Sequence, residues 1–152
     1  FVIKSNDELL GRIILLAAFM PIISAISGNT GLQSAAIVVR AIDTGNVNIN
    51  RWWEPLIRQF KTNLLIGSAV GIVIGIIGFI LSESQHFRFG LSVALSMFIS
   101  INIAGFVGTM FPMLSKRLGF DPAITSGPFE TAFQDVIGIS IFMAISTYLL
   151  TH

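Results

Sequence analysis

The feature that most constrains the fold is a set of long segments without any charged side chain. Segments 13–39, 62–82 and 89–115 contain 27, 21 and 27 consecutive uncharged residues. A helix needs about 20 apolar residues to cross the hydrocarbon core of a bilayer. Only 11% of the whole chain is charged, against about 25% in soluble domains. The sequence therefore predicts an integral membrane protein embedded in a lipid bilayer.

A fourth candidate span differs from these three because it contains acidic residues. It runs from about Pro122 to Leu150 and includes Glu130 and Asp135. We predict helices over residues 9–42, 53–81, 89–114 and 122–150. The polar, glycine-containing stretch 27–31 is expected to unwind the first helix locally. No alternation typical of strands is present, so we predict an all-α, polytopic membrane helix bundle.

The distribution of cations predicts the orientation. Six of the nine Lys and Arg residues lie in or beside the connections 40–61 and 115–121, and three lie on the opposite side. Cytoplasmic loops carry an excess of Lys and Arg. Loops 43–52 and 115–121 are therefore expected in the cytoplasm, with the amino terminus and His152 outside.

Several function classes are disfavoured by composition. The net charge is only +1 and no basic tract is present, so no nucleic-acid partner is expected. The absence of cysteine excludes disulfides and thiolate metal sites. We find no pairing of a nucleophile with a base, and His86 and His152 lie outside the spans. The chain is not expected to be an enzyme.

Small residues recur at intervals of four in two spans. Gly67, Gly71 and Gly75 form one stripe, and Ser96, Ser100, Ala104 and Gly108 form another. Small residues allow membrane helices to approach closely. Both stripes are therefore interpreted as packing surfaces, and Asn102 is expected to bond a neighbouring helix.

Asp135 is the side chain most informative about function. It lies about 20 Å from either end of the predicted fourth helix, near the middle of the membrane. Inserting an acid at this depth costs a free energy of at least about 2.5–3.5 kcal/mol. Acids inside membrane spans are therefore taken first as candidate functional residues. Three interpretations remain open: a protonated acid bonded to Asn29, Gln33 or Asn102, a proton relay, or a cation site. Oxygen ligands without thiols suit Mg²⁺, and two chains around a two-fold axis would supply two carboxylates.

Two further acids are candidate site residues. Glu130 lies about 140° around the helix from Asp135, so it is either at the cytoplasmic mouth of a pathway or in a polar contact between helices. Asp121 precedes Pro122, which is the pattern of an N-cap followed by a proline in the first turn. Asp121 is also within about 40° of Asp135 on a regular helix, so it is either a plain N-cap or part of a ring at the inner mouth of a pore.

Two segments resemble the MgtE family of magnesium transporters. "MPIISAISGNTGLQSAAIVVRAIDTG" (20–45) is similar to the family's P-x(5)-GGNxGxQ-x(6)-R signature, with Ser27 in place of the first glycine. "LGFDPAITSGPFETAFQDVIG" (118–138) is similar to its GxDPA-x-x-SGP-x-x-T-x-x-x-D-V-x-G segment. Their order and separation also match, and together they cover almost the whole chain.

The resemblance implies a fold and an activity. Residues 1–152 would be the transmembrane ion-conducting domain of a homodimer, truncated at its N-terminus, with four of five membrane helices and a pore on the dimer axis. The family's first membrane helix and its regulatory cytoplasmic N and CBS domains would precede Phe1. The expected activity is Mg²⁺ transport, with Mn²⁺, Co²⁺ and Ni²⁺ as alternative ions. The expected location is a bacterial inner (plasma) membrane.

The resemblance also implies roles for particular residues. Asp135 would bind hydrated Mg²⁺ at the pore centre, and Asp121 would be the acid near the cytoplasmic mouth. The implied pore-lining candidates are Gly28, Asn29, Thr30, Gly31, Thr131 and Gly138, with Glu130 as a further candidate.

Two other functions stay open at this point. In a proton-coupled cation carrier, Asp135 would be the titrating group and flux would depend on pH. A non-transporting membrane assembly subunit would handle ions equally well with Asp135→Asn.

Overall fold

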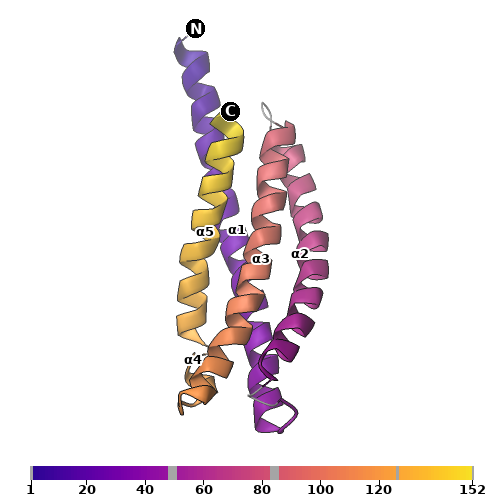
Figure 1. Ribbon diagram of the computed structural model, residues 1–152. Coiled ribbons are helices and arrows are strands. Elements are labelled where there is room, and N and C mark those ends of the chain that lie inside the picture. Colours follow the sequence, from indigo (N-terminus) through magenta and orange to yellow (C-terminus); the bar gives the residue numbers. More distant parts are fainter. Residues whose placement is uncertain (1, 48–50, 83–85, 126, 152) are drawn as a thin grey trace.

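The computed structural model describes residues 2–47, 51–82, 86–125 and 127–151, so Phe1 and His152 lie outside the described part. The side chains of 2–13, 86, 125, 128 and 151 are likewise outside it. The elements are α1 (Val2–Asp43), α2 (Trp53–Leu81), α3 (His86–Arg117), α4 (Pro122–Thr125) and α5 (Pro128–Thr151) (Figure 1). No strand occurs in these ranges, and four helices are long and apolar enough to cross a membrane. The predicted all-α bundle is confirmed.

The predicted unwinding of the first helix is wrong. Helix α1 continues through residues 27–31 without a break. The hydroxyls there return to their own helix: Ser27 Oγ donates to the Ile23 carbonyl at 2.7 Å, and Thr30 Oγ1 donates to the Ile26 carbonyl at 2.9 Å. These bonds satisfy the polar side chains inside the helix, so no backbone group has to open to meet them.

The predicted helix 122–150 is divided into a four-residue helix, α4, and the spanning helix α5. Asp121 Oδ1 accepts a hydrogen bond from the Ala123 amide at 2.9 Å, which confirms the N-cap. Helix α5 begins at Pro128. An N–H at this first position would have no acceptor within the helix, so proline loses no hydrogen bond there. Proline therefore starts a new helix here instead of continuing the previous one.

Helix α3 lies at the centre of the bundle and contacts α1, α2 and α5 (Figure 1). The glycine stripe of α2 packs directly on it. A Cβ added to Gly71 would lie 2.9 Å from the Ala94 carbonyl oxygen, and one added to Gly75 would lie 2.6 Å from the Ala94 Cβ. This confirms the stripe as a packing surface. Asn102 donates to the Phe98 carbonyl of its own helix at 2.8 Å, so the expected bond to a neighbouring helix is not observed.

The largest buried apolar cluster joins α1, α3 and α5 in the half of the bundle near the chain termini. Phe19 and Phe89 meet edge to face with ring centroids 5.4 Å apart, and Phe142 of α5 is fully buried beside them. The cluster's other buried members are Ile23, Val93, Met97 and Ile101. These side chains fix the register of α1 against α5 next to the acidic part of α5.

Glycine terminates two of the helices. Gly45 and Gly119 have φ of 72° and 83°, a backbone region that glycine enters without steric cost. The amides that follow them, of Asn46 and Phe120, bond to carbonyls five residues back, as in the Schellman motif. Both turns lie at the same end of the bundle, opposite the termini (Figure 1). The described parts of loops 43–52 and 115–121 therefore share one side, as the cation distribution predicts.

Candidate cation site

Asp135 lies where α5 packs against α1. Its side chain is half-buried, and Ser24 Oγ of α1 donates a hydrogen bond to its Oδ1. In the described ranges the one ion pair joins Arg51 and Glu54, so no Lys or Arg there neutralises this carboxylate. The sequence suggested the amides of Asn29, Gln33 and Asn102 as partners of Asp135, but its hydrogen bond comes from Ser24 instead.

Gly138 lies one turn after Asp135 and makes the helices approach closely. A Cβ on Gly138 would lie 3.3 Å from Ser27 Oγ and 3.9 Å from Ser100 Oγ. Thr131 lies one turn before Asp135, is half-buried, and donates its hydroxyl to the Gly127 carbonyl at 3.4 Å. The two positions implied to line a pathway thus flank Asp135 on α5.

One exposed face of α1 has small and polar side chains instead of large apolar ones. Ala25, Asn29, Gln33 and Ala36 are exposed, and their spacing of three or four residues puts them on one side of the helix. Asn29 and Gln33 make no side-chain hydrogen bond within the described residues. Polar side chains in membrane spans usually face the bundle interior or a water-filled cavity. This face is therefore suited to a partner subunit or water.

Other residues of the signature segment have little exposed surface. Thr30 and Gly31 are buried, and so is Gly28, although a Cβ on Gly28 would meet no atom within 4 Å. A Cβ on Gly108 of α3 would lie 2.9 Å from the Gly31 carbonyl carbon. Gly31 therefore allows α1 and α3 to touch backbone to backbone. Among the signature residues proposed to line a pore, Asn29 is the exposed one.

Glu130 lies inside the protomer. Its side chain is fully buried, and its carboxylate occupies the space left by the missing side chain of Gly31. Neither carboxylate oxygen has a hydrogen-bond partner in the described structure. Of its two interpretations, the structure matches the contact between helices, because the side chain faces α1 and not an open surface.

A polar layer continues from Glu130 to the next turn of α5. Gln134 Nε2 donates to the Ser100 carbonyl of α3 at 3.1 Å. Gln134 Oε1 and Ser100 Oγ are buried without a partner in the described residues. The layer ties α5 to α3 behind Asp135, and so fixes which way Asp135 points.

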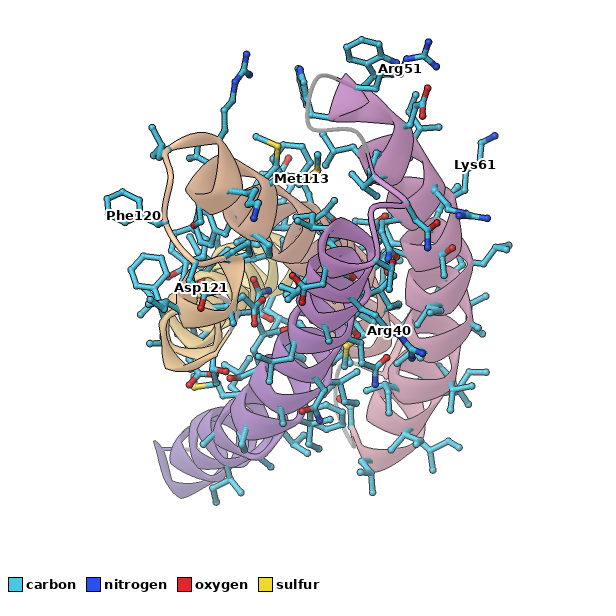
Figure 2. All side chains as sticks on the ribbon, turned by 90° about the horizontal axis from the view of Figure 1, so that it is seen from below. Arg40, Arg51, Lys61, Met113, Phe120 and Asp121 are labelled. Atoms are coloured by element: carbon cyan, nitrogen blue, oxygen red, sulfur yellow. The ribbon has the colours of Figure 1, made fainter. Side chains whose placement is uncertain are left out.

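Asp121 lies at the loop end of the bundle, away from Asp135. Its side chain is exposed (Figure 2), and one carboxylate oxygen is engaged by the Ala123 amide. Its charge is thus compatible with attracting cations to this end while its oxygen caps α4. The structure does not bring Asp121, Glu130 and Asp135 together in one site.

The donor set near Asp135 consists of oxygens. It comprises the Asp135 carboxylate and the Ser24 hydroxyl, and no cluster of three or more His, Cys, Asp or Glu side chains occurs in the described ranges. Hard oxygen donors in small number suit a cation that keeps much of its water, as Mg²⁺ does. The arrangement does not resemble a dehydrated metal cage.

Sequence reasoning missed Ser24 and Gln134 as parts of this region, whereas Gly108 belongs to a stripe that was predicted to pack helices. Ser24 is 111 residues from Asp135 in the chain, so spacing could not join them. A signal existed for Ser24, because it lies three residues before Ser27 on the same helical face.

Comparisons with known proteins agree with the helical architecture. Residues 20–145 match the family model MgtE, described as a divalent cation transporter. Relatives named magnesium transporter MgtE occur in Bacillus subtilis (33% identical, 96% of this chain), Enterococcus faecalis (29%, 99%) and Thermus thermophilus (28%, 98%). The chain spans about a third of their length, with 32%, 33% and 32% of each relative covered.

The family match covers more than half of the chain. The four long apolar helices of the chain agree with an integral, multi-pass membrane location. The chain therefore belongs to the MgtE family of divalent cation transporters.

Proposed function

We propose that this chain forms the membrane pathway of a Mg²⁺ transporter and that Asp135 holds the hydrated ion in it. The observation that carries the proposal is an unpaired, half-buried carboxylate within a membrane span, seven residues after the start of α5. Burying such a charge without a cation is costly, so a passing cation is its natural partner. The curated relatives are named magnesium transporters, which supports Mg²⁺ as the ion.

The pathway is proposed to lie between two copies of the chain. One chain offers a single carboxylate at this depth, and a homodimer offers two, matching the charge of Mg²⁺. Helix α1, which bonds Asp135 through Ser24, also has the exposed Asn29 face, and such small, polar surfaces suit a subunit interface that encloses water. Carbonyls near Thr131 and Gly138 would then meet the water shell of the ion.

Several other residues and segments have proposed roles. The exposed charge of Asp121 would concentrate cations at the loop end. In the family resemblance, regulatory N and CBS domains control the pathway, and we expect them in the complete gene product. The activity is proposed as passive transport and not as enzymatic catalysis.

The test is Mg²⁺ flux into liposomes that contain the complete gene product. Asp135→Asn should reduce the flux by at least tenfold, because the site loses its charge while keeping its shape. Asp43→Asn is the matched control, since Asp43 is exposed at the end of α1 and outside the proposed pathway. Competition with Mn²⁺, Co²⁺ and Ni²⁺ in the same assay measures selectivity.

Two outcomes would overturn the proposal. Unchanged flux with Asp135→Asn would favour an assembly subunit or a pathway elsewhere. Proton movement that accompanies the ion, abolished by Asp135→Asn, would favour a proton-coupled carrier with Asp135 as its titrating group.

A further inference from the structure

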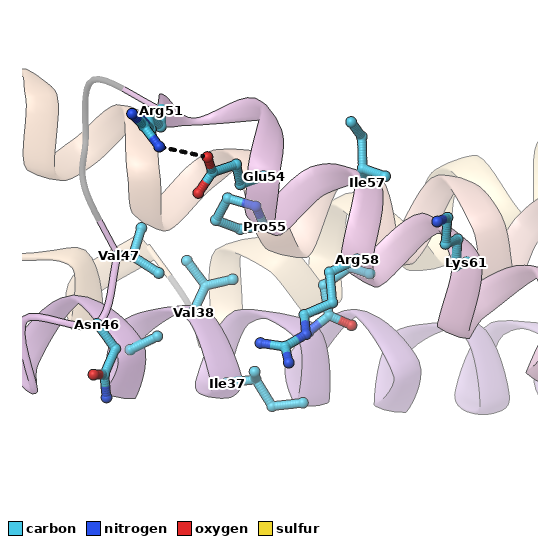
Figure 3. Close-up of a pocket in the computed structure, with 12 residues that line it drawn as sticks. Ile37, Val38, Asn46, Val47, Arg51, Glu54, Pro55, Ile57, Arg58 and Lys61 are labelled. Atoms are coloured by element: carbon cyan, nitrogen blue, oxygen red, sulfur yellow. Dashed lines mark hydrogen bonds and ion pairs between the residues drawn. The ribbon is translucent and has the colours of Figure 1, made fainter.

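A cavity of about 490 Å³ lies between the end of α1 and the start of α2 (Figure 3). Its volume is in the range of small-molecule sites. Its apolar walls come from both helices and the loop that joins them. These wall residues are Ile37, Val38, Ala41, Val47, Pro55 and Ile57. The cavity is remote from Asp135, which lies at the contact between α1 and α5.

The polar rim of the cavity is dominated by cations. Arg51, Arg58 and Lys61 line it together with a single acid, Glu54. Arg51 is neutralised by Glu54, with 3.2 Å between Nη1 and Oε1. Arg58 and Lys61 have no acidic partner in the described structure. The cavity therefore has a local excess of two positive charges.

The two unpaired cations come from neighbouring turns of α2, and Figure 3 shows their charged groups apart, with the Arg58 guanidinium nearer α1. They are three residues apart, which places them on neighbouring positions of one helical face. Figure 3 shows Arg58 extending from α2 towards Ile37 of α1. An arginine fork binds phosphate oxygens in pairs, and a lysine adds a point charge. The pair is thus well suited to a phosphate group.

A buried amide adds a further polar group to the cavity. Gln59 lines it and is only 8% exposed. An amide both donates and accepts hydrogen bonds, so it could bind a ligand with ester or hydroxyl oxygens below its phosphate.

The cavity lies at the depth of lipid headgroups. Trp52 and Trp53 are 41% and 48% exposed at the start of α2, and Trp is enriched at the membrane–water interface. Ile57 and Phe60 are each 53% exposed on the next turns, where the hydrocarbon begins. Basic pockets between membrane helices on the cytoplasmic side bind anionic headgroups. An acyl chain could leave the cavity along this apolar surface.

We propose that this cavity binds the phosphate headgroup of an anionic phospholipid, with Arg58 and Lys61 on the phosphate and Gln59 on the glycerol oxygens. The apolar walls hold the glycerol and the first methylenes of the acyl chains. The bound lipid would neutralise two cations that the protein leaves unpaired and would bridge the end of α1 and the start of α2.

Native mass spectrometry of the complete gene product in detergent tests the assignment. The probes are phosphatidylglycerol and, as a zwitterionic reference, phosphatidylcholine. The double variant Arg58→Gln/Lys61→Gln should weaken phosphatidylglycerol binding about 30-fold, from about 1 kcal/mol for each basic side chain. Lys116→Gln/Arg117→Gln is the matched control, because it removes the same charge at the same end of the bundle but outside the cavity. The control should bind as the wild type does.

A charge-preserving variant separates binding from folding. Arg58→Lys/Lys61→Arg should retain phosphatidylglycerol binding and elute as the wild type does in size-exclusion chromatography. Equal weakening by the Lys116/Arg117 control would indicate general surface attraction and overturn the site. Displacement of phosphatidylglycerol by free glycerol phosphate, or equal binding of phosphatidylcholine, would overturn the assignment to an anionic lipid.

Discussion

The contact between Gly31 of α1 and Gly108 of α3 provides the sharpest test of the packing, through the substitution Gly108→Ala. The added Cβ would lie 2.9 Å from the Gly31 carbonyl carbon and 3.1 Å from its Cα. Carbon–oxygen contacts between helices are normally about 3.3–3.6 Å, and the Gly31 oxygen is nearer still to this Cβ. The obstacle is backbone, so no side-chain rotation can relieve it, and the helices must separate by about 1 Å.

The expected cost follows from two opposing effects. Overpacking a well-filled interior costs about 1–3 kcal/mol, whereas replacing glycine by alanine inside a helix gains up to about 1 kcal/mol. The net destabilisation is therefore about 1–2 kcal/mol. For a chain of this size it corresponds to a fall in Tm of about 2–8 °C.

The assay is thermal unfolding of the purified protein in one detergent, with Gly28→Ala as the matched control. Gly28 belongs to the same segment of α1, and a Cβ added to it would meet no atom within 4 Å. The control should keep the Tm of the wild type or raise it. If Gly108→Ala is as stable as Gly28→Ala, the close approach of α1 and α3 is wrong.

Two other substitutions test the proposed pathway. The chain has no cysteine, so Asn29→Cys introduces a single thiol, and a short bismaleimide should link two copies in membranes. Ile76→Cys, on an apolar surface of α2 that is 54% exposed, should not link, and equal linking of both would argue against an interface on α1. Asp121→Asn should lower Mg²⁺ flux without lowering Tm, because asparagine caps a helix about as well as aspartate but is uncharged. A loss of Tm with unchanged flux would limit Asp121 to capping.

The spans and the helix ends could be predicted because local properties determine them. Uncharged length sets the number of spans, and the pair Asp121–Pro122 marks the start of α4 through a cap and a fixed φ. The glycine stripe of α2 was recognisable because membrane helices need small residues to approach closely. These signals lie within one helix or one turn of the chain.

The site could be predicted only in part, because neighbours distant in sequence decide it. The prediction that Asp135 lies midway along its helix was wrong, because α5 begins at Pro128 and Asp135 lies only seven residues after its start. The bond from Ser24 was not predictable, because it depends on how α1 and α5 are aligned. The angle of about 140° between Glu130 and Asp135 indicated two directions without naming what each side chain faces. The expected break at 27–31 failed because polar residues were interpreted as breaking the helix, although hydroxyls can bond back within it.

The structure divides the signature segment of α1 between two roles, which makes stability and transport separable. Ser27, Thr30 and Gly31 face the protomer interior, where they pack and bond within the bundle. Asn29 points to the opposite, exposed side. Substitutions of the buried residues should therefore change Tm first and flux as a consequence. Substitutions of Asn29 should change flux at constant Tm, and a variant of Asn29 that lost both together would contradict this division.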